Sequence, residues 1–145
     1  MFLLLSIPSK AEEPRIIDGD TLILNGTRIR LHGIDAPESK QRCWKKGDWW
    51  KCGQAATDFL RSLVRDRDVT CQPITQDRYK RTVAKCFAGE LDISRSVVRA
   101  GYALAYRRYS KEYVEAENAA KEEQQGLWAG DFLPPWEWRK AKHQY

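Results

Sequence analysis

The chain has 145 residues, of which 42% are hydrophobic and 31% charged, and this length fits one domain with one modest core. Its formal net charge is +5, with 25 Lys and Arg against 20 Asp and Glu, so nucleic acid is a natural partner. No apolar run approaches the about 18 residues of a membrane-spanning helix, so the sequence predicts none.

The N-terminus resembles part of an export signal. Residues 2–7 are mostly apolar, and the Ser-Lys-Ala run at 9–11 resembles the small-x-small pattern before a signal-peptidase cut, although a basic region is missing. A short buried N-terminal strand is the alternative. We therefore expect residues 1–11 to be the remnant of a signal peptide and residues 12–145 to form a single domain. The protein is then secreted or periplasmic and has no membrane contact once the signal is removed.

Residues 21–31 predict a β-hairpin. Two runs with alternating apolar side chains flank an Asn-Gly pair at 25–26, which suits the positive φ angles of a two-residue type I′ turn. That turn sets Thr21 opposite Arg30. Side chains just before and just after the hairpin therefore lie at the same end of it, although they are far apart in the sequence.

Carboxylates flank this hairpin, with Asp18 and Asp20 before it and Asp35 and Glu38 after it. Carboxylates that are held close together repel one another, and a hard cation such as Ca²⁺ or Mg²⁺ relieves that repulsion. We therefore expect Asp20 and Asp35 to bind a metal ion, with Asp18 as outer support. Taken alone, the Asp-Gly-Asp run at 18–20 is also typical of a turn.

The four cysteines predict two disulfides. Cys43 and Cys52 bracket one polar loop, and Cys71 and Cys86 lie in two predicted strands on either side of one connection. Four cysteines allow three pairings, and these positions favour 43–52 and 71–86. An even count behind an export signal also favours disulfides. A zinc site is the alternative, but the sequence has no CxxC pair and only two His.

The rest of the chain predicts helices around a further pair of strands. These elements are a helix at 54–65, strands at 69–74 and 82–87, a helix capped by Asp92 that runs to about residue 100, and a charged helix from Ser110 to Gly126. About five strands on this length favour a small closed barrel with helices outside. The Trp residues of the loop at 39–52 and of the tail either pack against the protein or stack on bases.

Two arginines complete a set of groups that suits phosphodiester hydrolysis. A phosphodiester attacked by water develops negative charge, which a metal ion and the planar forks of Arg30 and Arg81 neutralise. Glu38 is a candidate to take a proton from the attacking water, and the backbone near Ala36 offers a carbonyl ligand. For any single arginine in so basic a chain, a solvated surface charge is the alternative.

The motifs IDGDTL, RLHGIDAPE and DRYKRTVA, in this order, resemble those of the staphylococcal nuclease (thermonuclease) family, and SVVRAGYALAYRRYS and NAAKEEQQGLW are similar to it as well. The resemblance covers residues 14–139. It implies a mainly β fold with α, namely a five-stranded OB-type β-barrel packed by three helices. It also implies calcium-dependent hydrolysis of DNA and RNA with low sequence selectivity, which leaves 3′-phosphate and 5′-hydroxyl ends.

The resemblance also assigns roles to individual residues. The implied ligands of one Ca²⁺ are Asp20, Asp35 and the backbone carbonyl of Ala36. The implied catalytic residues are Arg30, Glu38 and Arg81, with Glu38 as the general base and the arginines on the phosphate. The implied nucleotide-pocket residues are Tyr79 and Tyr106. The expected substrate is DNA or RNA that is single-stranded or locally opened, and a monomer is expected.

One departure from the family pattern bears on the site. Lys80 stands where the family usually has a glycine before the second arginine. If this position has a positive φ, a lysine there is strained, and the direction of Arg81 becomes less certain. Ala36 stands where the family commonly has Thr, but this matters little for a backbone ligand.

Two other functional classes compete with the nuclease. A non-catalytic OB module binds single-stranded nucleic acid without chemistry and has no need of the acid cluster. A disulfide-braced structural domain that binds Ca²⁺ explains the acids but gives Arg30 and Arg81 no task. Cleavage assays with and without metal separate these classes.

Overall fold

A computed structural model of the protein describes residues 12–142. The signal-peptide remnant expected at 1–11 lies outside the described residues. Within residues 12–142, no helix combines the length and the apolar character needed to cross a membrane.

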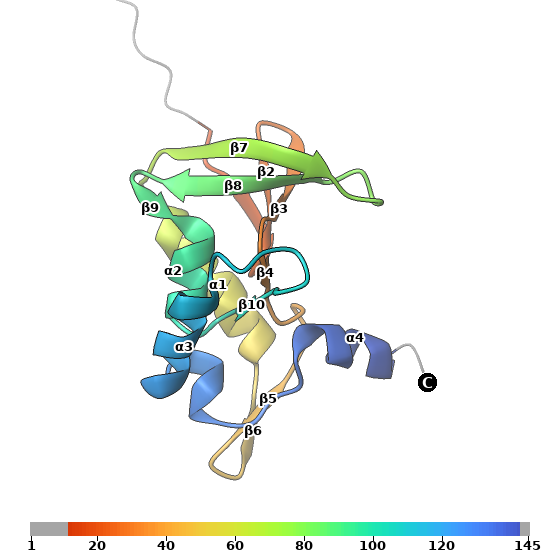
Figure 1. Ribbon diagram of the computed structural model, residues 1–145, viewed down its shortest axis with the longest axis vertical. Coiled ribbons are helices and arrows are strands. Elements are labelled where there is room, and N and C mark those ends of the chain that lie inside the picture. Colours follow the sequence, from red (N-terminus) through yellow and green to blue (C-terminus); the bar gives the residue numbers. More distant parts are fainter. Residues whose placement is uncertain (1–11, 143–145) are drawn as a thin grey trace, which may run out of the picture.

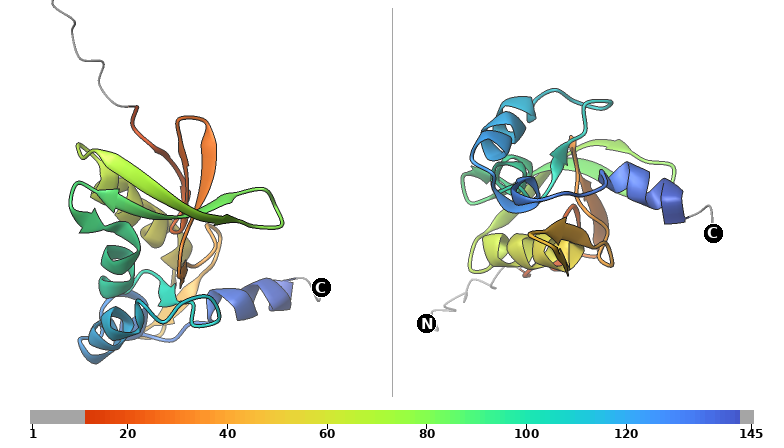
Figure 2. Two further views of the ribbon diagram at one scale, coloured as in Figure 1. Left: turned by 45° about the horizontal axis from the view of Figure 1, so that its top comes forward. Right: turned by 90° about the horizontal axis from the view of Figure 1, so that it is seen from below.

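Five strands form a curved sheet in the order β1-β2-β3-β8-β7, and the short strand β9 pairs with β8. Their bounds are β1 Arg15–Asp18, β2 Thr21–Leu24, β3 Thr27–Leu31, β7 Val69–Gln76, β8 Thr82–Ala88 and β9 Leu91–Asp92. Neighbours are antiparallel except β3 and β8, which run parallel. Figures 1 and 2 show β7 and β8 lying across the β2–β3 hairpin, so the sheet curls around a core as in an OB-type barrel. The expected fold class is confirmed.

The β2–β3 hairpin has the predicted register. Thr21 pairs with Arg30, and the turn residues Asn25 and Gly26 have φ angles of 50° and 77°. Both angles lie in the left-handed region that a type I′ turn requires. The carboxylates before and after the hairpin are thereby brought to one end of it.

Three helices pack on one side of the curved sheet, as Figure 1 shows. They are α1 Cys52–Val64, α2 Ile93–Arg99 and α3 Val114–Glu122. The Asp92 side chain caps α2 as predicted, by accepting a hydrogen bond from the Arg95 N–H. The prediction for α3 was wrong at both ends. Ser110 does not cap this helix, because its hydroxyl accepts from the Glu112 N–H and forms a turn before the helix begins.

The elements of two regions were not predicted, those of the loop at 39–52 and those of the tail. The polar loop at 39–52 contains a small hairpin of β5 Cys43–Lys45 and β6 Asp48–Trp50. The tail contains a short 3₁₀ helix, η1 Gly126–Ala129, and a fourth α-helix, α4 Pro135–Lys142. The described chain thus has four α-helices instead of three. Figure 1 shows that α4 extends away from the other helices, beside the loop that leads to β5.

Both predicted disulfides are present. Cys43 is bonded to Cys52 beside the β5–β6 hairpin, and Cys71 to Cys86 across the β7–β8 ladder, where the two residues are register partners. No free cysteine remains among the described residues, so the zinc alternative is excluded.

Candidate active site

The site is built at the open end of the β2–β3 hairpin. Asp20 lies directly before β2, and Asp35 lies in β4 Ile34–Asp35, which pairs with β10 Leu104–Ala105. Both carboxylates are buried, with 5% of Asp20 and none of Asp35 exposed. The Arg30 guanidinium lies between them, with Nη1 3.1 Å from Asp20 Oδ2 and Nη2 3.4 Å from Asp35 Oδ1. The structure therefore brings together three residues that the sequence assigned to one site.

Local hydrogen bonds fix the Asp20 carboxylate. Its Oδ2 accepts from the Ala36 N–H at 2.7 Å, and its Oδ1 accepts from the Thr21 hydroxyl at 3.0 Å. Asp18, in turn, accepts from the Asp20 N–H at 3.1 Å and so supports the turn. The Asp-Gly-Asp run thus forms a turn and also supplies a buried acid. The Ala36 carbonyl stays a predicted ligand.

A second arginine, Arg139 of α4, completes the charge cluster. Its two terminal nitrogens bind both oxygens of Asp35, at 3.0 Å for Nη1 to Oδ1 and 2.8 Å for Nη2 to Oδ2. The same Nη1 lies 3.0 Å from Oε1 of Glu38, which is partly exposed. No pattern in the sequence indicates this contact, because Arg139 is one of many basic residues and lies more than one hundred positions from either acid.

Gln41 connects Glu38 to the tail. This amide side chain is 1% exposed. Its Oε1 accepts from the Glu38 N–H at 3.3 Å, and its Nε2 donates to the carbonyl of Leu133 at 2.8 Å. Gln41 therefore fixes the backbone of the candidate base and the start of the segment that leads into α4. No sequence pattern indicates this role for a single glutamine in a polar loop.

Burial and mutual repulsion shift the pKa values of the acids. Burial raises the pKa of Asp18 to about 8, and the neighbouring Asp20 carboxylate adds to the effect. Burial also raises the pKa of Asp35 to about 6, although Arg139 and Arg30 act in the opposite direction. For Asp20, the nearby Arg30 and hydrogen bonds outweigh burial, so its pKa lies below the usual value. The cluster holds more negative charge than its surroundings stabilise well.

The structure does not bring the Arg81 guanidinium to the acid cluster. Its Nε donates to Asp77 Oδ2 at 2.7 Å, within the β7–β8 connection. Asp77 Oδ1 also accepts from the backbone N–H groups of Tyr79 and Arg81. Lys80 has a φ of 63°, the left-handed conformation for which a glycine is the better residue. The condition stated for this position, a positive φ at Lys80, is therefore met, and Lys80 directly precedes the arginine that faces Asp77.

Replacing Asp77 by Ala is expected to loosen this connection and to lower the free energy of unfolding by about 1–2 kcal/mol. Burial raises the pKa of Asp77, but hydrogen bonds from Arg81 outweigh it, so the folded-state pKa lies below the ordinary 3.8. A carboxyl group with a lowered pKa stabilises the fold above its ordinary pKa and loses this effect as the pH falls through the lowered value.

Urea unfolding of Asp77→Ala and of the parent protein, at pH 7 and in steps below pH 4, tests this role. The difference between them should be largest at pH 7 and shrink below pH 4. The control is Asp48→Ala, which removes an exposed carboxylate at the start of β6. Equal losses in the two variants at pH 7 would contradict the role given to Asp77.

The two predicted nucleotide-pocket tyrosines lie in different surroundings. Tyr79 is 65% exposed and lies under the Arg78 and Arg81 guanidiniums, at 4.9 and 5.7 Å from its ring centre. Tyr106 follows β10, and its ring lies edge-on to Trp136 of α4 with centres 5.3 Å apart. Trp136 thus docks α4 beside the site, as a packing residue.

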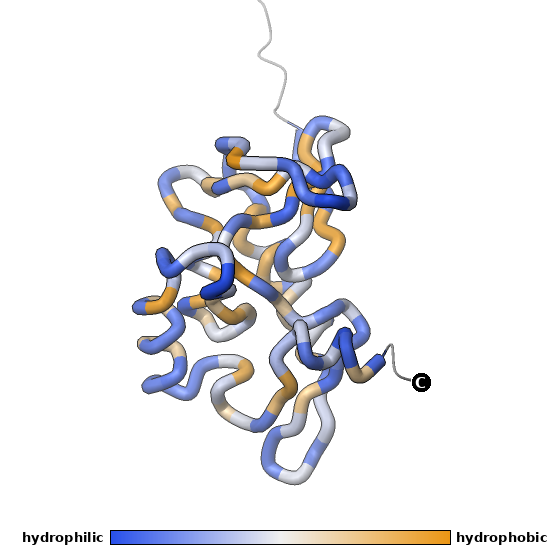
Figure 3. Tube along the Cα trace, turned by 45° about the vertical axis from the view of Figure 1, so that its right-hand side comes forward, coloured by the Kyte–Doolittle hydropathy of each residue, from blue (hydrophilic) through white to orange (hydrophobic). Residues whose placement is uncertain are grey.

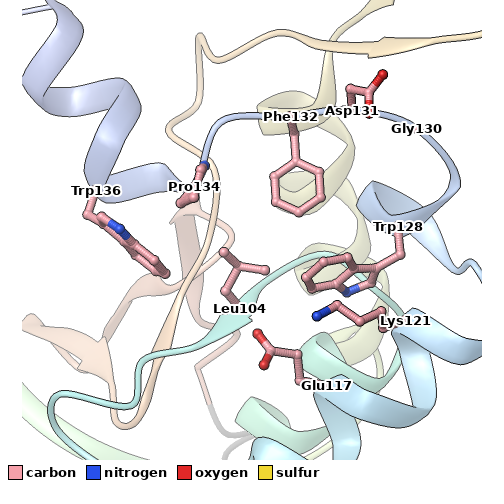
Figure 4. A pocket seen from close by; sticks show the side chains of 9 residues that line it. All are labelled: Leu104, Glu117, Lys121, Trp128, Gly130, Asp131, Phe132, Pro134 and Trp136. Carbon is pink, nitrogen blue, oxygen red and sulfur yellow. The ribbon is translucent and has the colours of Figure 1, made fainter.

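A pocket of about 450 Å³ lies behind this contact, between α3 and the tail. Figure 4 shows Trp136 at one side of it, Phe132 and Trp128 at the other, and Leu104 between them. Trp128 and Phe132 pack edge to face at 5.0 Å, and the Lys121 ammonium lies 4.8 Å from the Trp128 ring centre. The tail is therefore anchored against α3 before α4 begins.

The donor set suits a hard divalent cation, although not by carboxylates alone. In the part of the chain described here, no group of three or more His, Cys, Asp and Glu side chains is arranged to hold a metal ion. Asp20 and Asp35 are two buried carboxylates with hard oxygen atoms, and Ca²⁺ or Mg²⁺ takes further oxygens from backbone, water or phosphate. Because Arg139 binds both oxygens of Asp35 and Arg30 contacts one oxygen of each acid, the pair would hold a cation once Arg139 has moved and Arg30 has loosened its contacts.

Comparison with known proteins decides the family. The family described as staphylococcal nuclease homologue matches residues 28–130. The chain belongs to this family. The resemblance carried by the sequence motifs is confirmed, and membership identifies this staphylococcal nuclease homologue as a phosphodiesterase of the nuclease type.

Several curated proteins are similar over most of the chain. An uncharacterized endonuclease of Escherichia coli O157:H7 is 37% identical over 136 residues, which cover 88% of this chain and 83% of that protein. A micrococcal nuclease of Shigella flexneri is 33% identical, over 96% of this chain and 87% of its own. The succinoglycan biosynthesis protein ExoI of Rhizobium meliloti is 33% identical, over 87% and 71%. Two of these names state nuclease activity and the third does not, so the details of function rest on the site.

Proposed function

We propose that this staphylococcal nuclease homologue hydrolyses phosphodiester bonds of DNA and RNA with Ca²⁺ as cofactor and with low sequence selectivity. The observation that supports it most is the buried Asp20–Arg30–Asp35 arrangement, beside which Glu38 lies partly exposed. Stability alone does not require two acids and an arginine in one buried place, because a buried ion pair can often be replaced by apolar residues. They are useful where a cation and a phosphate must both be bound.

In the proposed mechanism, Asp20 and Asp35 hold the cation, with the carbonyl of Ala36 as a third protein ligand. A bound Ca²⁺ would neutralise phosphate charge and orient the phosphodiester. Arg30, already fixed between the two acids, presents its guanidinium to the phosphate, where it stabilises the charge that develops during attack. Residues that are positioned beforehand need no rearrangement as the charge develops.

Glu38 acts as the general base in this proposal. Its side chain is 34% exposed, so water can reach it, and its backbone is fixed through Gln41. A carboxylate takes a proton from water most readily when it is not already paired with a cation. Its present contact with Arg139 must therefore open before Glu38 acts.

The products are proposed to carry 3′-phosphate and 5′-hydroxyl ends. The basic chain attracts the nucleic-acid backbone without reading its sequence, which supports low selectivity. Tyr79 and Tyr106 are proposed to line the nucleotide pocket of a single-stranded or locally opened substrate, and Arg81 to reach the phosphate after its turn rearranges. Two disulfides support a secreted or periplasmic location, and the protein is proposed to act as a monomer.

The test of this proposal is cleavage of end-labelled single-stranded DNA and RNA with CaCl₂, and then with a chelator. We expect cleavage at many positions with calcium and loss of at least about 100-fold of the rate on chelation, since the metal supplies several kcal/mol. Chemical analysis of the ends should find 3′-phosphate. Binding without cleavage under calcium, magnesium and manganese would reject the enzyme and favour a non-catalytic nucleic-acid-binding OB module.

A further inference from the structure

Arg139 occupies carboxylate oxygen atoms that a metal ion would need as ligands. It binds both oxygens of Asp35 and one oxygen of Glu38. Asp35 is fully buried, and its second oxygen meets only Arg139 among the hydrogen bonds of the described residues. Asp35 Oδ1 already accepts from Arg30 and Arg139, and Oδ2 accepts from Arg139, so a cation beside Arg139 would find few free lone pairs and a like charge next to it. Arg139 and a cation therefore compete for Asp35.

The helix that carries Arg139 contacts the rest of the described protein through few side chains. Up to Leu133 the tail is fixed by hydrogen bonds, from Gln41 to the Leu133 carbonyl and between Trp44 and Asp131 in both directions. Beyond that point only Pro135 is buried in α4. Figure 3 shows this helix, beside the C-terminal label, as mainly hydrophilic. Trp136 against Tyr106 is its aromatic contact.

The local charge favours exchange of Arg139 for a divalent ion. Asp20, Asp35 and Glu38 bring three carboxylates, and Arg30 and Arg139 bring two guanidiniums, which leaves −1 when all are ionised. A divalent cation balances that excess better than a single guanidinium does. The departing Arg139 reaches solvent readily, because 36% of its side chain is already exposed. The exchange needs no rearrangement of the core, because the tail up to Leu133 keeps its hydrogen bonds to Gln41 and Trp44.

We propose that α4 is a displaceable cover of the active site, in which Arg139 substitutes for the metal ion until a divalent cation takes its place. This inference rests on the proposed function, since it concerns the same acids. In the closed position, Arg139 stabilises Asp35 and keeps Glu38 paired. In the open position, Asp35 binds the cation, Glu38 is free to act as base, and Trp136 leaves Tyr106. A cation binds the open position only. Its apparent dissociation constant is therefore that of the open position divided by the fraction of molecules that are open.

Calcium binding in the absence of nucleic acid tests the exchange. Isothermal titration with CaCl₂ compares the parent with Arg139→Gln and with the matched control Lys140→Gln, which removes the same charge from an exposed neighbour on α4. We expect Arg139→Gln to bind calcium about tenfold more tightly, a typical coupling between two competing occupants. Lys140→Gln should change the affinity less than about twofold, as for an exposed charge. Arg139→Lys should lie between, because lysine keeps the charge and loses the two-pronged contact.

The position of α4 in the unaltered protein is tested independently of any Arg139 variant. Protein labelled with 5-fluorotryptophan gives one ¹⁹F resonance for each Trp, and Trp136→Phe identifies that of Trp136. Saturating CaCl₂ should move the Trp136 resonance toward the value of a solvent-exposed indole, while the resonance of Trp128, which is anchored against α3, moves little.

The two measurements separate this inference from the nuclease proposal. Tighter binding in Arg139→Gln together with a moved Trp136 resonance supports the cover. Calcium binding of equal strength in all variants, with an unmoved Trp136 resonance at saturation, overturns the cover and leaves the nuclease proposal intact. Weaker binding in Arg139→Gln also overturns it, because Arg139 would then position the ligands. No calcium binding to the parent or to any variant overturns both the cover and the calcium dependence of the nuclease.

Discussion

Replacing Glu38 by Gln is expected to lower the turnover of nucleic-acid cleavage by about 10²–10⁴-fold, the usual contribution of a general base. The amide keeps the shape of the side chain but cannot accept a proton from water. Asp20, Asp35 and Arg30 are untouched, so the affinity for a nucleotide should change little. Single-turnover cleavage of end-labelled DNA gives the rate, and titration with a nucleotide gives the affinity.

Glu115→Gln is the matched control for this substitution, because Glu115 is an exposed carboxylate on α3 away from the acid cluster. Its turnover should equal that of the parent. Of the two substitutions, only Glu38→Gln also removes the charge that pairs with Arg139. Cleavage by Glu38→Gln at the parent rate would reject Glu38 as the base.

Replacing Arg30 by Gln is expected to destabilise the protein by about 3–5 kcal/mol and to abolish measurable cleavage. Arg30 is only 17% exposed and compensates the charge of Asp20 directly. Its removal leaves a buried carboxylate without its ion-pair partner, and it also removes a donor to the phosphate. Urea unfolding without metal measures the first effect, and cleavage well below the unfolding midpoint measures the second.

Arg28→Gln is the appropriate comparison, since Arg28 lies on the same strand, two residues away, with an exposed side chain. Its unfolding free energy should differ from that of the parent by less than about 0.5 kcal/mol, as for surface substitutions. Added CaCl₂ should restore part of the stability that Arg30→Gln loses, because a cation relieves the same repulsion. An Arg30→Gln protein as stable as Arg28→Gln would show that the buried acids do not depend on this arginine.

Local sequence rules were sufficient for the hairpin that builds the site. An Asn-Gly pair fixes the turn, the turn fixes the register, and the register brings Asp20, Arg30 and Asp35 to one end. Both disulfides followed from the positions of the cysteines relative to predicted strands. In each case a short-range signal determines a contact between residues close in the chain, which is where sequence reasoning is strongest.

Contacts made by the tail could not be predicted in the same way. Arg139 and Gln41 act across the whole length of the domain, and neither belongs to a periodic apolar pattern. The helix α4 has eight residues, four of them charged, and no apolar stripe indicates where it docks. For Arg81, a positive φ at Lys80 was raised as a condition, but nothing in the sequence indicated the competing acceptor Asp77, to which the guanidinium points.

A crystal structure with Ca²⁺ and a non-hydrolysable dinucleotide analogue tests the account most directly. The account predicts one calcium ion bound by the carboxylates of Asp20 and Asp35, the analogue's phosphate on the Arg30 guanidinium, and Arg139 no longer bonded to Asp35. Calcium and phosphate bound elsewhere on the protein, with Arg139 still paired to both oxygens of Asp35, would contradict it.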